Sequence, residues 1–208
     1  MANLSFGGNN VSSYYDLAKK GQIFMAQAIV TAPVAYTTAA GTGGPLLWNG
    51  TGGATVIGEG PGAIISPNQQ VDAVILGVSY GVTVAETTAG ISIGLTGGGA
   101  QTAAPTATTA IDGITCTRVT PSNIGPLGAG NKCSVYRVGT VATAGNWFMP
   151  LCSLDTTALT AMPHQPNYID LAGMYVIPPN GWIAVSASAA GTAAVLQIGL
   201  VWAEIPRL

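Results

Sequence analysis

The sharpest chemical motif in the sequence is Gly77-Val78-Ser79-Tyr80-Gly81, which matches the G-x-S-x-G elbow of serine hydrolases. Asp112 or Asp155 and then His164 follow in the Ser, Asp, His order of an α/β-hydrolase. An elbow needs a sharp turn from a strand into a helix, whereas a β-type alternation continues beyond this motif. We therefore expect Ser79 to be a polar position on a strand. A serine hydrolase that uses Ser79 and His164 is a distant alternative.

The other groups that could do chemistry are few and scattered. Cys116, Cys133 and Cys152 lack CxxC spacing, and His164 is the single histidine. A structural zinc site needs four soft ligands, usually in two close pairs, so buried free thiols are the better interpretation. The carboxylates show neither calcium-loop spacing nor a close pair, and there is no P-loop or strict G-x-G-x-x-G. We expect no catalytic residue, no cofactor and no metal site.

From Gln22 onward the sequence has the pattern of β-strands. Apolar runs are bounded by Gly, Pro, Asn or Asp, and no helical segment separates them. This organisation predicts an all-β fold, an antiparallel β-sandwich that is jelly-roll-like. The predicted strands are Gln22–Val30, Val71–Val84, Gly90–Thr96, Ile114–Thr120, Ser134–Ala142, Trp147–Cys152, Trp182–Ser188 and Ala194–Glu204.

Two of these strands indicate which side is apolar. Ile198, Leu200 and Trp202 repeat every second residue near the C-terminus. An alternating set in Val71–Val84 predicts one apolar face, formed by Val74, Leu76, Val78, Tyr80, Val82 and Val84.

One short helix is predicted near the start of the chain. Ser13 and Asp16 have the spacing of a capping box, and Gly21 is a helix-ending residue. The helix is expected over Tyr14 to Lys20, about two turns, with its lysines at the negative end of the dipole.

The domain organisation follows from these elements. We expect residues 1–20 to form an N-terminal arm with the short helix, and residues 21–208 to form a single sandwich domain. The low-complexity stretch Gly97–Ala110 is predicted as a long loop inside that domain. Residues 1–21 lack the basic and apolar regions of a secretory signal, which predicts synthesis in a cytoplasm. The glycosylation pattern at Asn49-Gly50-Thr51 then indicates only a turn.

Charge is scarce along the whole chain. Lys and Arg account for 6 of the 208 residues and Asp and Glu for 8, whereas glycine accounts for 29. A free-standing soluble domain devotes about a quarter of its residues to charge, so we expect much of the surface to be covered by copies of the chain or by a larger assembly. Six scattered basic residues exclude a basic face for nucleic acid. No apolar run approaches the roughly 18 residues of a membrane helix.

Two parts of the sequence resemble β-sandwich virion proteins of tailed bacteriophages. The residues 173–185, GMYVIPPNGWIAV, and 195–206, VLQIGLVWAEIP, resemble the closing hairpin of such proteins. Residues 45–49, PLLWN, which lead through Gly60-Pro61-Gly62 to 71–80, VDAVILGVSY, are similar to an earlier part of them. The resemblance covers about half of the chain and contains no invariant motif.

The resemblance implies a jelly-roll protein that forms a homotrimer on the outside of a phage head. Its expected role is that of a capsid decoration (cement) protein, with the major capsid protein as its partner. The expected location is the capsid surface of the virion, after synthesis in the host cytoplasm. No catalytic residues carry over, because the family has none to place on this sequence.

Other functions remain open at this stage. The protein could instead be a head- or tail-fibre receptor-binding head that recognises host glycans. Exposed aromatic rings would then be the stacking platforms, for which Trp48, Trp147, Tyr168 and Trp182 are candidates. We favour core or interface positions for these rings, because large aromatic side chains are usually buried.

Overall fold

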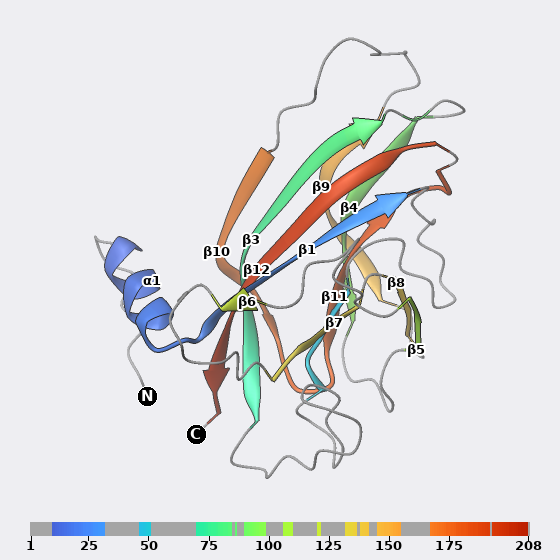
Figure 1. Ribbon diagram of the computed structural model, residues 1–208. Helices are drawn as coiled ribbons and strands as arrows, with labels where there is room; N and C mark the ends of the chain where they lie inside the picture. The colour runs from blue at the N-terminus through green and yellow to red at the C-terminus, as the bar shows by residue number, and fades with distance from the viewer. Residues whose placement is uncertain are drawn as a thin grey trace.

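The computed structural model describes residues 10–31, 46–50, 70–84, 86, 90–98, 106–109, 120–121, 132–136, 138–141, 145–154, 167–191 and 193–207. This part of the chain contains one helix, α1 (Asn10–Lys19), and twelve strands (Figure 1). The strands are β1 (Ile23–Thr31), β2 (Leu46–Trp48), β3 (Val71–Val84), β4 (Ile91–Gly98), β5 (Thr106–Thr109), β6 (Thr120–Pro121), β7 (Ser134–Tyr136), β8 (Val138–Thr140), β9 (Asn146–Leu154), β10 (Asn167–Ile177), β11 (Trp182–Ala187) and β12 (Val195–Pro206).

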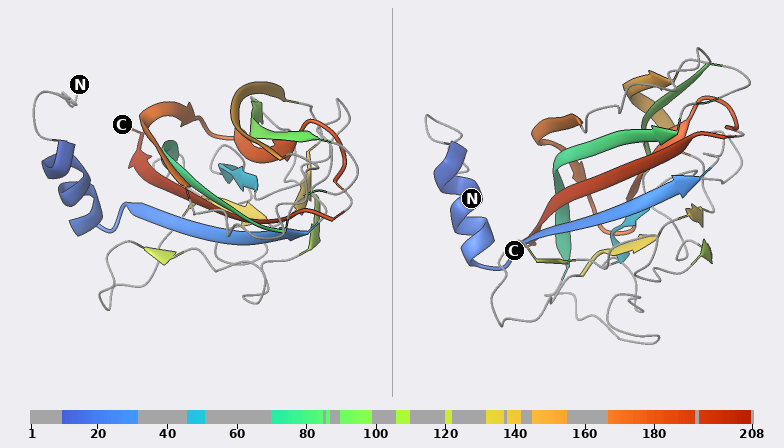
Figure 2. Two further views of the ribbon diagram at one scale, coloured as in Figure 1. Left: turned by 90° about the horizontal axis from the view of Figure 1, so that it is seen from above. Right: turned by 45° about the horizontal axis from the view of Figure 1, so that its top comes forward.

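The strands form two five-stranded antiparallel sheets that pack as the layers of a sandwich (Figure 2). Sheet A has the order β10-β3-β12-β1-β6, and sheet B has the order β7-β2-β11-β4-β9. Strands β5 and β8 form a separate pair. The pairing is nested, because β1 pairs with β12, β2 with β11, β3 with β10 and β4 with β9. The predicted all-β antiparallel sandwich is therefore confirmed.

The main core lies between the two sheets. The side chains of Ile198, Leu200 and Trp202 on β12 are buried there, as their alternation predicted. On sheet B the inward residues include Ile183 and Val185 of β11. Burial of such side chains contributes about 1.5–3 kcal/mol each before conformational entropy is subtracted.

Several strand predictions need correction. Residues predicted as the loop Gly97–Ala110 include the end of β4 and all of β5, and the predicted strand Ser134–Ala142 is divided into β7 and β8. Strands β2 and β10 were not predicted. Of the predicted strand Ile114–Thr120, only Thr120 lies within the described residues, where it begins β6.

The prediction of one apolar face along β3 is also wrong, because the strand carries a bulge at Leu76. Trp202 of β12 pairs with Ile75, whereas its neighbour Val201 pairs with Gly77, so Leu76 is an additional residue. An extra residue reverses which side chains point inward. Before the bulge Ala73 and Ile75 face the core, and after it Val78 and Val82 do, while Val74 and Leu76 lie on the outer side.

Helix α1 covers that outer side at one end of sheet A (Figures 1 and 2). Its residues Tyr14, Leu17 and Ala18 pack against a cluster that contains Ile23, Leu76 and Ala203. The spacing of the three helical residues is the i, i+3, i+4 pattern of an amphipathic helix.

The ends of α1 confirm one prediction and correct another. Gly21 has φ of 69°, its N–H donates to the Ala18 carbonyl at 2.9 Å, and the Gln22 N–H donates to the Leu17 carbonyl at 2.9 Å. This pair of bonds is a Schellman motif, which glycine favours at this position. The helix begins at Asn10, however, so Ser13 lies inside it and the predicted capping box with Asp16 is wrong. Packing of the helix on the sheet sets its length.

Candidate interaction surface

Ser79 lies in the middle of β3, which continues without interruption to Val84. The backbone at Gly77–Gly81 therefore does not make the strand-to-helix turn that presents a nucleophilic serine. The Ser79 side chain is half-buried on the outer side of sheet A, where its Oγ lies against Gly199 of β12. His164, Asp112 and Asp155 lie outside the described residues.

The thiols do not form a metal site in the described part of the chain. Cys133 is fully buried and Cys152 is half-buried, and both are thiols rather than disulfides. Burial raises the pKa of Cys152 to about 11 and that of Cys133 well above its usual value. Within the residues that the structure describes, no group of three His, Cys, Asp or Glu side chains could hold a metal ion. Cys116 lies outside that part.

The four aromatic candidates for ligand stacking have different environments. Trp48 and Trp182 are buried in a second cluster on the outer side of sheet B, as the core interpretation predicted. Trp147 is half-buried, with its ring across Gly94. Tyr168 of β10 is 58% exposed, with its ring across Gly77. Only Tyr168 therefore presents a large aromatic surface to solvent among these four.

A buried glutamate joins the two sheets. Glu204 of β12 accepts the backbone N–H of Lys132 at 2.6 Å and that of Cys133 at 2.9 Å. The indole N–H of Trp202 donates to the same carboxylate at 3.1 Å. Lys132 and Cys133 directly precede β7 of sheet B, so these bonds cross from one sheet to the other. The carboxylate is satisfied by hydrogen bonds, and its role is structural.

Burial raises the pKa of Glu204 above its usual value. The hydrogen bonds from Cys133, Lys132 and Trp202 oppose this shift, because they stabilise the charged carboxylate. The loss of hydration is the larger effect.

A second buried glutamate, Glu86, lies between β3 and β4. The backbone N–H groups of Ala193 and Ala194, which precede β12, donate to its Oε2 at 3.4 Å each. Both buried glutamates thus bind two consecutive backbone amides of a distant segment. The bonds to Glu204 are shorter, and charge-assisted hydrogen bonds strengthen as they shorten.

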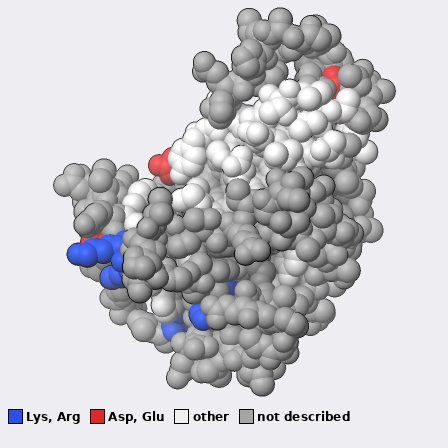
Figure 3. All heavy atoms as spheres, viewed as in Figure 1, with Lys and Arg blue, Asp and Glu red and all other residues white. Residues whose placement is uncertain are grey.

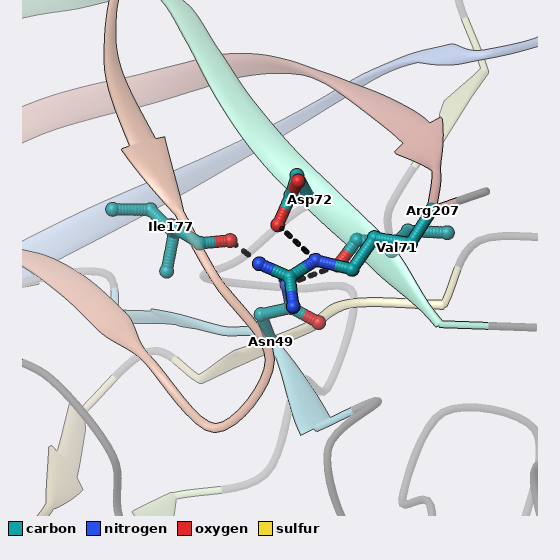
Figure 4. Close-up of polar contacts among 5 residues, drawn as sticks. All are labelled: Asn49, Val71, Asp72, Ile177 and Arg207. Atoms are coloured by element: carbon teal, nitrogen blue, oxygen red, sulfur yellow. Dashed lines mark hydrogen bonds and ion pairs between the residues drawn. The ribbon is translucent and has the colours of Figure 1, made fainter. Parts of the chain in front are cut away.

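Asn49, directly after β2 of sheet B, joins four segments of the chain (Figure 4). Its side-chain amide donates to the carbonyls of Val71 at 2.7 Å and Ile177 at 2.9 Å. Its backbone N–H donates to the Gly181 carbonyl at 2.9 Å, and the Asn180 N–H donates to its carbonyl at 2.6 Å. Asn49 is fully buried, so its glycosylation pattern marks a structural position.

The outer side of β3, β12 and β1 beyond α1 carries no charged side chain, and we call it the open face. Figure 3 shows it as a white surface over β3, β12 and β1. Met25 and Gln27 of β1 and Gln197 of β12 are exposed there, around the small residues Ser79 and Gly199. The full set is Met25, Gln27, Ile29, Thr31, Gly77, Ser79, Gly81, Thr83, Val195, Gln197 and Gly199.

A second exposed surface follows β10, at the edge of sheet A. We call Tyr168, Met174 and Val176 the β10 flank, because all three are exposed on the outer side of β10. The rings of Phe148 and Tyr175 have centroids 4.7 Å apart, which joins the edge strand β9 of sheet B to β10. The flank borders the open face, since Tyr168 pairs with Ser79.

Basic side chains are separated in the described part of the chain. Lys19 and Lys20 lie at the end of α1, and Lys132 lies before β7. Arg207 forms an ion pair with Asp72 at 2.9 Å near the end of β12. Figure 3 shows blue atoms in one group at the left of the view and in a second group below it. None of the described helices is long and apolar enough to cross a membrane.

The sequence did not locate either surface. Scarcity of charge predicted an exposed uncharged surface, but the position of the open face depends on the bulge at Leu76. The flank depends on β10, which was not predicted. The exposed pair Met174 and Val176, two residues apart, was the signal that could have indicated it.

Comparison with models of known protein families gives no match for this chain, and comparison with curated proteins gives none either.

Proposed function

We propose that the protein is a non-enzymatic structural protein of a phage particle, a decoration protein that binds the head shell as a homotrimer. The observation that carries this proposal is the open face, a broad sheet surface without a charged side chain in a sandwich whose other sheet is buried on both sides along β2 and β11. Uncharged surface of this kind is suited to burial against another protein. In this proposal the open face contacts the shell.

The order of the strands supports a jelly roll. Four nested pairs run from β1 with β12 to β4 with β9, so the chain resembles one long hairpin that is rolled into two sheets. Eight strands in two such sheets are the architecture of a jelly roll, which is common in viral capsid proteins. The fold supports the proposal as an analogy, and the surface supplies the physical argument.

The test uses heads from a phage that encodes the chain, prepared with and without its gene. We expect heads without the protein to lose their contents at a lower temperature, and added protein to bind them to saturation and restore stability. Binding is measured by co-sedimentation. Heads of equal stability in both preparations, without binding of added protein, would contradict the proposal.

A charge on the open face sharpens this test. Gln197→Lys places an ammonium group at the centre of the face, where contact with the shell would bury it at high cost. We expect affinity for heads to fall at least about tenfold. Ala190→Lys, in the exposed turn between β11 and β12, is the matched control and should bind as the unaltered protein does.

A further inference from the structure

Exposed large apolar side chains concentrate on the β10 flank. Tyr168 is 58% exposed, Met174 72% and Val176 52%. Among the described residues only Met25, Val84 and Phe148 are other large hydrophobic side chains of this kind. Such gathering of apolar side chains at one edge of a sandwich is typical of an interaction surface.

The apolar area of the flank approaches the area that a stable protein contact needs. Three side chains at these exposures present roughly 300–400 Å², given that a large aromatic side chain buries about 150–250 Å². A standard interface buries about 800 Å² on each partner, of which somewhat more than half is apolar. The flank therefore supplies most of the apolar part of one half of such an interface.

Charge on the flank is as scarce as a buried contact requires. Within β9 and β10 the only charged residue is Asp170, and its carboxylate accepts the N–H of Ala172 at 2.8 Å. Depletion of charge distinguishes the centre of an interface from ordinary surface.

The backbone of β10 indicates that the contact is made by side chains. Ala172 and Gly173 have φ of 48° and 77°, and the pairing with β3 is interrupted between Asp170 and Tyr175. A bulge in an edge strand prevents the regular addition of another strand. The partner must therefore pack on Met174 and Val176 rather than extend sheet A.

We infer that the β10 flank is the contact with a second copy of this chain, which rests on the proposed assembly around the phage head. The open face then stays available for the shell. Around a three-fold axis the flank of each copy packs on a different patch of the next copy, so the same contact repeats around the assembly.

The experiment measures the molar mass of the full chain in solution by sedimentation equilibrium, without phage heads. We expect a multiple of 20.8 kDa for the unaltered chain. Met174→Lys and Val176→Lys should each weaken association at least about 30-fold, because a charge would be buried in the contact. Both side chains are exposed in the single copy, so circular dichroism should show an unchanged fold.

Met25→Lys is the matched control, since it makes the same change on an exposed methionine of the open face. We expect its mass to equal that of the unaltered chain. A mass of 20.8 kDa at all concentrations for the unaltered chain would overturn the inference. Equal weakening by Met25→Lys would overturn it as well.

Binding to heads separates this inference from the proposed function. If Met174→Lys keeps the assembled mass but loses binding to heads, the flank contacts the shell and the inference is wrong. If the flank variants dissociate while no form of the protein binds heads, self-association stands and the decoration role fails.

Discussion

The two sheets of the sandwich differ most on their outer sides. On sheet B the outward residues Leu46, Trp48, Trp182 and Ala184 are almost completely buried, and Thr96 and Ser186 bond to each other at 2.9 Å. On sheet A the outward residues beyond α1 are small or uncharged, and many are exposed. Strand β11 is buried at every position, whereas β1 alternates between buried and exposed.

This difference shows how the chain distributes its large side chains. Tryptophan on the outer side of sheet B is covered within the protein, since exposing such surface to water is costly. Where no cover is present, β1, β3 and β12 of sheet A carry mainly small or polar residues such as Ser79 and Gln197, and Met25 and Val84 are the large side chains exposed there. The open face is thus compatible with water before assembly and with a flat partner after it.

The largest expected effect tests the buried outer side of sheet B. Trp182→Ala should lower the free energy of unfolding by about 3–5 kcal/mol, because it leaves a large cavity beside Trp48. Met25→Ala on the open face should change it by less than about 0.5 kcal/mol. Urea unfolding of both variants measures the contrast. Similar values for the two would remove the distinction between the outer sides.

The next prediction concerns Glu204, which joins the two sheets. Glu204→Ala leaves the N–H groups of Lys132, Cys133 and Trp202 without their acceptor, at a cost of about 3 kcal/mol. The effect should be seen in urea unfolding at neutral pH. Glu86→Ala, whose bonds are longer, should cost less. A larger loss of stability for Glu86→Ala than for Glu204→Ala would show that hydrogen-bond length does not predict how much each carboxylate stabilises the fold.

Glu204 also predicts a dependence of stability on pH. Its pKa in the folded protein lies above the usual 4.5, so the folded state takes up a proton more readily than the unfolded chain. The stability gained by protonation is complete below the unfolded pKa and is lost as the pH rises through the folded pKa. Relative to Glu204→Gln, the unaltered protein should therefore gain stability as the pH is lowered from neutral to about pH 5. A constant difference in unfolding free energy would contradict the raised pKa.

A smaller effect compares glycines in the two sheets. Each lies beneath an aromatic ring of an edge strand, Gly94 beneath Trp147 and Gly77 beneath Tyr168. An added Cβ on Gly94 would also meet the backbone carbonyl of Met149 at 2.6 Å, whereas on Gly77 it meets only the exposed Tyr168. Gly94→Ala should cost about 2–3 kcal/mol and Gly77→Ala about 1 kcal/mol. Thermal unfolding distinguishes them, and equal costs would mean that Tyr168 is held as firmly as Trp147.

The smallest expected effect is at the ion pair of sheet A. Arg207 and Asp72 are 46% and 28% exposed, so solvent screens their attraction. Arg207→Ala should lower stability by less than about 1 kcal/mol, and 1 M salt should remove the difference. A larger loss in urea unfolding would indicate that the arginine stem contributes by packing.

Strands with clear flanking turns were predictable from the sequence. β11 follows Pro178-Pro179-Asn180-Gly181, a turn in which Asn180 has φ of 65° and the Gly181 N–H donates to the Pro178 carbonyl at 2.8 Å. β10 was missed because Asp170 and Gly173 are turn-forming residue types inside the strand, and because it exposes Met174. The β-propensities of single residues could not predict the bulge in β10, because pairing with the neighbouring strand β3 stabilises it.

The candidate surfaces were less predictable than the strands. Whether Leu76 or Val78 faces the core depends on one additional residue in β3, which only the pairing with β12 defines. Likewise, no pattern in the sequence indicated that Glu204 would bond to the segment before β7. Contacts between residues far apart in the chain decide both features.

The position of β12 has a consequence for synthesis of the protein. Ile23 of β1 pairs with Ala203, which the ribosome adds 180 residues later, and β12 lies between β1 and β3 at the centre of sheet A. At roughly 5–20 residues per second, β1 waits roughly 10–35 s for this neighbour. Sheet A therefore receives its central strand after both neighbours of that strand have been made, and removing β12 would remove the centre of the sheet rather than its edge.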